Sequence, residues 1–78
     1  MPTIFILNGF RFFFYSGDKA EPIHVHVEKG NATAKFWVSP VRLERSNGFS
    51  RKDLSKIHDI INEKKTVIKR RWNEFFYD

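Results

Sequence analysis

The sequence contains no cysteine, so neither a disulfide nor a thiolate metal site can stabilise the fold. It also lacks a long hydrophobic run: "TIFIL", near the N-terminus, is far shorter than the roughly 20 residues that a membrane-spanning helix needs. No basic n-region or small-residue cleavage site precedes it. These absences predict a cytoplasmic protein with no membrane partner. Stability must come from apolar burial, for which nine Phe and two Trp among 78 residues supply the surface.

The charge is unbalanced toward lysine and arginine. The formal net charge is +5 and the sequence pI is about 9.8. A basic chain of this size suits an acidic partner, either a nucleic acid or an acidic protein.

Residues 1–45 carry the patterns of β-strands joined by tight turns. Asn8-Gly9 between two apolar runs is a strong hairpin signal. In the strand that follows, alternation predicts that Phe10, Phe12 and Phe14 face the core and that Arg11, Phe13 and Tyr15 face the other way. A second hairpin is predicted around "KGN" at 29–31, and Pro40 is expected to break or bulge the fourth strand, with "VRLER" resuming it.

Residues 50–76 carry helical periodicity. Ser50 is a suitable N-cap, and Asp53 completes an approximate capping box. One apolar stripe runs along the segment, formed by Leu54, Ile57, His58, Ile61, Ile68, Trp72, Phe75 and Phe76. An unbroken helix would be roughly 39 Å long, whereas a six-residue strand covers about 20 Å.

The end of such a helix would extend beyond the sheet. Because "NEKKT" contains no proline or glycine to force a kink, we expect another chain to cover the exposed end, either in a homodimer or in a pair with a partner protein. The predicted interface residues are Ile68, Trp72, Phe75 and Phe76.

The segment "IHVHVE" places His24, His26 and Glu28 on one face of a strand and three apolar residues on the other. Three interpretations are open. The histidines can be half-exposed structural residues, an acid–base pair, or metal ligands. Glu28 would lie about 13 Å from His24 along the strand, so no third ligand is evident, and we predict no metal and no cofactor.

The acid–base interpretation gives His24 and His26 the catalytic roles, since imidazole titrates near neutrality. RNA could then be cleaved without a metal, because its own 2′-hydroxyl is the nucleophile. On the same face, Arg11 and Lys35 are candidates to hold phosphate, and Tyr15 and Trp37 are candidates to stack a base.

Several segments together resemble one family: "MPTI" at the start, "GFRFFFYS", "EPIHVHVEKG", "AKFWVSPVRLERSNGFS" and the closing "RRWNEFF". It is the bacterial domain-of-unknown-function family four-one-six-zero, and the resemblance covers essentially the whole chain. Its most specific part is matched by Pro22, His24, His26 and Val27. The family often has two prolines before the first histidine, where this chain has "EPIH". Members are typically encoded beside a small partner, so the resemblance implies a toxin–antitoxin-type setting and no particular catalytic residues.

We therefore expect a single α+β domain spanning residues 1–78. Its antiparallel sheet has four to five strands, and one long C-terminal helix packs on one face. The expected function is the toxin-like component of a toxin–antitoxin-type module, either a metal-independent ribonuclease or an RNA-binding protein. The alternative is a non-enzymatic adaptor, or an antitoxin-like partner, that docks another protein through its C-terminal helix.

Overall fold

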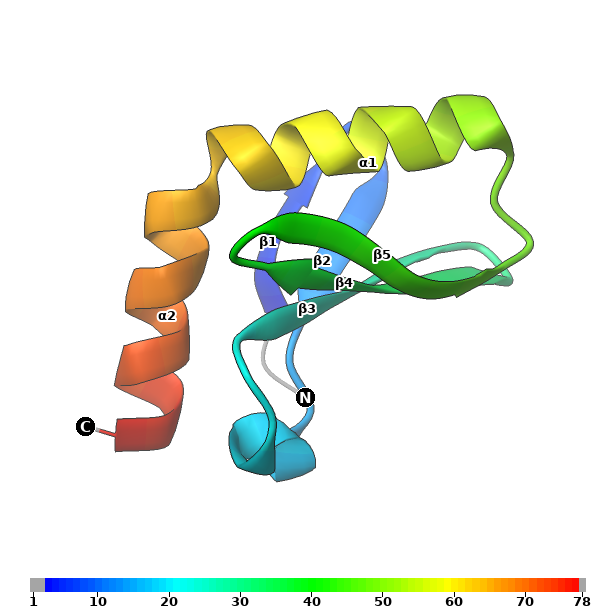
Figure 1. The fold of residues 1–78 in the computed structure, drawn as a ribbon. Coiled ribbons are helices and arrows are strands. Elements are labelled where there is room, and N and C mark those ends of the chain that lie inside the picture. The colour runs from blue at the N-terminus through cyan, green and yellow to red at the C-terminus, as the bar shows by residue number, and fades with distance from the viewer. Residues whose placement is uncertain (1–2, 78) are drawn as a thin grey trace.

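The computed structural model describes residues 3–77, which form an α+β fold with one five-stranded antiparallel sheet. The strands are β1 (Thr3–Leu7), β2 (Phe10–Phe13), β3 (His24–Lys29), β4 (Ala32–Val38) and β5 (Val41–Asn47). They are paired in sequence order, so the sheet is a meander (Figure 1). A 3₁₀ helix, η1 (Ser16–Ala20), lies between β2 and β3. The α+β class and a sheet within the predicted range of strand number are confirmed.

The first hairpin turns at Asn8-Gly9, as predicted. Asn8 and Gly9 have φ angles of 54° and 81°, the pair of positive values that a two-residue type I′ turn requires. The turn fixes the register in which Leu7 pairs with Phe10. This register directs Phe10, Phe12 and Phe14 into the core, where each is at most 1% exposed.

The segment after Pro40 differs from the prediction that it resumes the fourth strand. Ser39 and Pro40 form a turn, and Val41–Asn47 returns antiparallel as β5, with Val41 paired to Val38. A register shift between Lys35 and Phe36 bends the β4–β5 pair. Proline suits this position because its missing N–H removes no ladder bond in a turn.

The predicted single helix over residues 50–76 is wrong. The chain forms α1 (Arg51–Glu63) and α2 (Lys65–Tyr77), separated at Lys64. Ser50 caps α1, accepting the Asp53 backbone N–H at 3.1 Å. At Lys64 the backbone leaves helical geometry (φ −101°, ψ 17°), although its N–H still donates to Ile60 O at 2.9 Å.

The break lets the second helix turn down past the sheet. In Figure 1, α1 lies across the sheet and α2 runs at a steep angle to it beside the sheet. Both helices contribute to the core: Ile57 and Ile61 of α1 are fully buried, and so is Ile68 of α2. The physical cause is the burial of α2's own apolar side chains, above all Trp72, which is 3% exposed and lies edge-on to Phe14 with 5.2 Å between ring centroids.

No helix within residues 3–77 has both the length and the apolar character needed to cross a membrane.

Candidate functional site

The two strand histidines share one face of β3, as the alternation predicts. Val25 and Val27, on the opposite face, are at most 1% exposed and join the hydrophobic core. On the neighbouring strand β4, Lys35 pairs with His26 and Trp37 pairs with His24. The register therefore brings the predicted cation and the predicted indole beside the histidines.

The histidines are more buried than the sequence suggested. His24 is 0% exposed and His26 is 9% exposed. The His24 ring lies edge-on to Trp37 of β4 and Trp72 of α2, with centroid distances of 5.6 and 5.4 Å. Helix α2 thus covers part of this face. A single straight helix could not reach it.

His26 lies in its own aromatic surroundings. The Phe13 ring stacks on it at a centroid distance of 5.6 Å, and the Tyr15 ring packs edge-on at 4.5 Å. Burial lowers the pKa of the His26 imidazole below its usual range, while the neighbouring Asp18 carboxylate acts in the opposite direction. The lowered pKa favours the neutral imidazole, which keeps a lone pair on one ring nitrogen.

Asp18 completes the cluster and is not among the site residues predicted from the sequence. Its Oδ1 lies 3.1 Å from Nε2 of His24, and its Oδ2 lies 3.1 Å from Nε2 of His26. Asp18 Oδ2 also accepts the Tyr15 backbone N–H at 2.8 Å, which holds the carboxylate at the start of η1. The only sequence signal was an acidic residue in the polar loop "GDKAEP", and that pattern by itself indicates a turn.

The two cations predicted to hold phosphate are engaged with carboxylates. Lys35 is 7% exposed, and its Nζ donates to Glu21 Oε1 at 2.6 Å. That hydrogen bond lowers the pKa of the Glu21 carboxyl. Arg11 Nη1 donates to Glu28 Oε1 at 2.6 Å. Because Arg11 and Lys35 each already pair with a carboxylate, the principal phosphate ligand has to be another residue.

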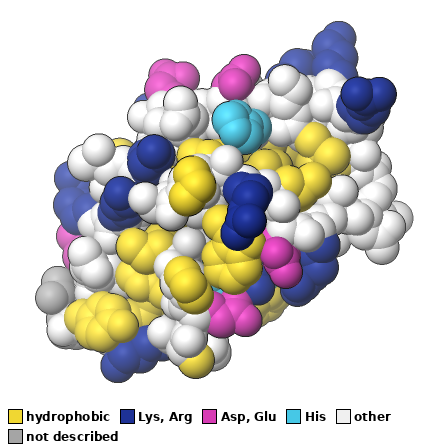
Figure 2. Space-filling view, viewed as in Figure 1, with side chains coloured by type: hydrophobic (Ala, Val, Ile, Leu, Met, Phe, Trp, Pro, Cys, Tyr) yellow, Lys and Arg dark blue, Asp and Glu magenta, His cyan; other side chains and the backbone are white. Residues whose placement is uncertain are grey.

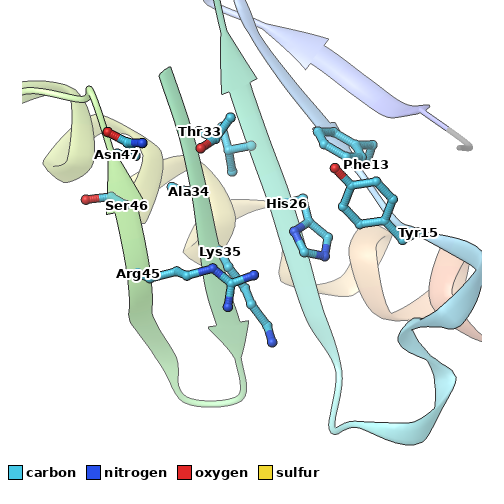
Figure 3. A pocket seen from close by; sticks show the side chains of 10 residues that line it. Phe13, Tyr15, His26, Thr33, Ala34, Lys35, Arg45, Ser46 and Asn47 are labelled. Carbon is cyan, nitrogen blue, oxygen red and sulfur yellow. The ribbon is translucent and has the colours of Figure 1, made fainter. Parts of the chain in front are cut away.

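A groove of about 310 Å³ opens on this face of the sheet. Figure 3 shows His26 between the Phe13 and Tyr15 rings on one side and the Lys35 and Arg45 side chains on the other. The polar residues Thr33, Ser46 and Asn47 line the remainder. Arg45 is not predicted from the sequence because "VRLER" is expected to continue the fourth strand, whereas it returns beside that strand and pairs Arg45 with Lys35.

The other predicted residues lie apart from this groove. Trp37 is part-buried, donates from Nε1 to Glu44 Oε1 at 2.9 Å, and lines a separate hollow with Pro22 and Arg42. His24 has no exposed surface and does not line the groove. Of the predicted groups, the structure brings Tyr15, His26 and Lys35 together at the groove.

The partner interface was predicted because the end of the helix was expected to lie exposed beyond the sheet. Ile68 is 0% exposed and Trp72 is 3% exposed within the chain itself, so neither forms an uncovered overhang. Phe76 is partly buried against the core, and Phe75 remains 40% exposed. The chain instead kinks between its two helices and folds the second one back, which the sequence did not predict.

The fold and the site together define a small α+β domain with an aspartate and two histidines clustered on one face of a meander sheet. The chain belongs to the family described as "Domain of unknown function (DUF4160)", whose model matches residues 9–73. The matched range contains Asp18, both strand histidines and Trp72. No curated protein and no solved structure matches the chain.

Proposed function

We propose that this chain is the RNA-binding, toxin-like component of a bacterial toxin–antitoxin-type module, and that the groove over β3, β4 and β5 holds a phosphodiester strand. The observation that carries the proposal is the composition of the groove: one imidazole, two cations and an exposed phenol around a single hollow. Cations suit phosphate, and a phenol ring suits a stacked base.

Arg45 is the principal phosphate ligand in this proposal. It is exposed, and no carboxylate within residues 3–77 lies within ion-pair distance of it. Lys35 adds positive potential from beneath, although its ammonium is held by Glu21. Tyr15 is 44% exposed and offers a ring face to a base. General positive charge does not carry the proposal, because lysine and arginine side chains are scattered among acidic and hydrophobic ones on the face in Figure 2.

His26 is the member of the histidine pair that contacts the bound strand. Its Nε2 donates to Asp18 Oδ2 at 3.1 Å, and its Nδ1 makes no hydrogen bond within residues 3–77. His24 is buried, so the two-histidine acid–base scheme reduces to one imidazole contact from His26. Cleavage, where it occurs, would then fall on the phosphodiester next to His26.

The first experiment measures binding of a fluorescein-labelled single-stranded RNA by anisotropy at several salt concentrations. Wild-type affinity should fall with salt by about 0.7 log units per log unit of salt for each phosphate contact. Arg45→Ala should weaken binding and reduce that slope by about one contact. The matched control is Arg51→Ala, which removes an exposed arginine from α1. Equal losses in the two variants, or binding that does not depend on salt, would contradict the proposal.

The second experiment tests the toxin-like role in growing bacteria. Expression of the chain alone should slow growth, and co-expression of the protein encoded beside it should restore growth. His26→Ala should relieve the toxicity, while His58→Ala, at a half-exposed position on α1, should not. Normal growth with the wild-type chain alone, at confirmed expression, would remove the toxin assignment and leave RNA binding to stand on the first experiment.

The adaptor hypothesis receives less support from the same residues. Two of its four proposed contact residues, Ile68 and Trp72, are buried inside the chain. We therefore propose RNA as the partner in preference to docking through the C-terminal helix.

A further inference from the structure

Three metal-ligating atoms converge beside the groove. Each of Asp18, His24 and His26 offers one such atom, and these atoms all lie within 4.8 Å of one another. The nearest approaches, from each Nε2 to a carboxylate oxygen, are both 3.1 Å. Glu28 is too distant from His24 to be a third ligand, which is why the sequence predicts no metal; in the structure Asp18 supplies the third ligand atom.

The tautomer of His24 follows from its hydrogen bonds. Nδ1 lies 2.9 Å from the Pro22 carbonyl oxygen. Since a carbonyl only accepts, Nδ1 must carry the proton, and in the neutral ring Nε2 then presents a lone pair. This arrangement, with one ring nitrogen donating to a backbone carbonyl and the other left for an ion, is the usual setting of a metal-bound histidine.

The lone pair of His24 has no satisfactory partner within residues 3–77. Nε2 is fully buried and makes no hydrogen bond there. Asp18 Oδ1 lies only 3.1 Å away, but the geometry between the two atoms is not that of a hydrogen bond. A lone pair facing a carboxylate in a buried site is unfavourable unless a positive species lies between them.

Asp18 Oδ1 does not lie where a hydrogen-bond partner of His24 Nε2 would, and this position suits two ligands that bind the same ion. With ligand distances of about 2.0–2.1 Å, a nitrogen and an oxygen 3.1 Å apart subtend about 100° at the ion. That angle lies between the octahedral and tetrahedral values. In a tetrahedral shell, ligand atoms are about 3.4 Å apart, so a pair at the 4.8 Å limit would have to close by about 1.4 Å.

We propose that Asp18, His24 and His26 bind one divalent transition-metal ion of the zinc class. Two imidazoles select Zn²⁺, Co²⁺, Ni²⁺ or Fe²⁺ over Mg²⁺ and Ca²⁺, which prefer oxygen ligands. Three protein ligands leave a further coordination position for water or a substrate oxygen, as catalytic rather than structural sites do.

This inference goes beyond the proposed RNA binding, because the ion binds whether or not RNA is present. It also connects the cluster to the groove. Binding of the ion at Nε2 requires the other tautomer of the neutral His26 ring. The proton that Nε2 donates to Asp18 moves to Nδ1, which can donate it in a hydrogen bond to a phosphate oxygen. His26 then acts as a ligand and a donor, so it no longer serves as a base.

The test uses the untagged 78-residue chain, stripped with a chelator and titrated with ZnCl₂. Calorimetry should show one ion per chain, and thermal denaturation should show a zinc-dependent rise in the melting temperature. CoCl₂ should give ligand-field absorption bands at the same stoichiometry. MgCl₂ should cause neither effect.

Variants locate the ion. Asp18→Asn and His26→Gln should weaken zinc binding at least about tenfold, with folding confirmed by circular dichroism. His58→Ala removes the remaining histidine, which is half-exposed beside Asp59 on α1, and should bind zinc as the wild type does. Loss of binding in His58→Ala, full binding in both cluster variants, or no zinc binding by the wild type would each overturn the proposal. None of these results depends on RNA, so a failure of the proposed function is recognised separately.

Discussion

Nε2 of His24 lies 3.1 Å from Oδ1 of Asp18, and no hydrogen bond joins them. Each atom is nevertheless held firmly from its other side. His24 is fixed by Pro22 O through Nδ1, and Asp18 is fixed by the Tyr15 backbone N–H through Oδ2. The approach is therefore imposed by two separate anchors, and its energetics depend on what lies between the two atoms.

Replacing Asp18 by asparagine should not destabilise the metal-free protein. The Asn amide oxygen can still accept from the Tyr15 N–H and from His26, and its NH₂ group can donate to the His24 lone pair. Asp18→Ala offers none of these contacts and should lower the melting temperature. Both measurements are made by thermal denaturation in excess chelator. Equal losses in the two variants would contradict these replacement contacts and show that the negative charge of Asp18 itself stabilises the metal-free fold.

Trp72 should stabilise the isolated monomer. Its ring is 3% exposed and contacts Phe14 and His24, so Trp72→Ala should cost about 3–5 kcal/mol of unfolding free energy. Trp72→Phe keeps an aromatic ring and should cost less. The measurement is chemical denaturation of dilute protein.

Phe75→Ala provides the control for Trp72, since Phe75 is 40% exposed on the same helix and should lose less stability. A wild-type transition midpoint that rises with protein concentration, together with an unaffected Trp72→Ala monomer, would return Trp72 to a subunit interface.

Features set by neighbouring residues were predictable from the sequence. Asn8-Gly9 specifies a turn type through its own backbone preferences, and the alternation through Phe10, Phe12 and Phe14 follows from strand geometry. The β3 alternation that puts His24 and His26 on one face is of the same kind. None of these depends on a distant part of the chain.

The break at Lys64 and the position of Asp18 depend on tertiary contacts. Nothing in "NEKKT" forces a kink. The helix divides there because burying Trp72 against Phe14 and His24 stabilises the chain more than the backbone hydrogen bonds of an unbroken helix would. Asp18 reaches the histidines because η1 folds back over their face. The helix stripe showed that its apolar residues needed cover but did not identify what covers them.

The Asn8-Gly9 turn should be sensitive to a side chain at Gly9. Its φ of 81° lies in the left-handed region, so Gly9→Ala should cost about 1–2 kcal/mol. A Cβ there would lie 3.3 Å from Cε of Lys29, whose flexible side chain can move aside. The matched control is Gly17→Ala. The φ angle of Gly17 is not positive, and a Cβ added there would meet no atom beyond its chain neighbours within 4 Å. Denaturation midpoints that fall equally would contradict the turn assignment.

The Lys35–Glu21 pair should behave as a buried cation with a half-exposed partner. Glu21→Gln leaves the ammonium of Lys35, whose side chain is 8% exposed, without its counter-charge and should lower the denaturation midpoint. Lys35→Met keeps the apolar stem beside Trp37 and removes the charge that needs a partner. Combining the two substitutions should therefore recover stability relative to Glu21→Gln alone. A double variant that simply adds the two losses would show that Lys35 is solvated independently of Glu21.

Arg11 and Arg45 should separate the stability of the fold from RNA binding. Arg11 is held by Glu28 at 2.6 Å and Thr3 at 2.8 Å, and it lies 4.4 Å from the Phe13 ring centroid. Arg11→Ala should therefore lower stability, by up to about 1 kcal/mol for the ion pair, and change RNA affinity little.

Arg45→Ala should have the opposite effects, since Arg45 is exposed and lines the groove. Its loss should leave the denaturation midpoint within about 0.5 kcal/mol of wild type and reduce the salt dependence of RNA binding by about one phosphate contact. The same two variants are compared by denaturation and by anisotropy with one RNA. If Arg11→Ala weakened RNA binding as much as Arg45→Ala, the strand would lie across β2, and the groove over β5 would not be its binding site.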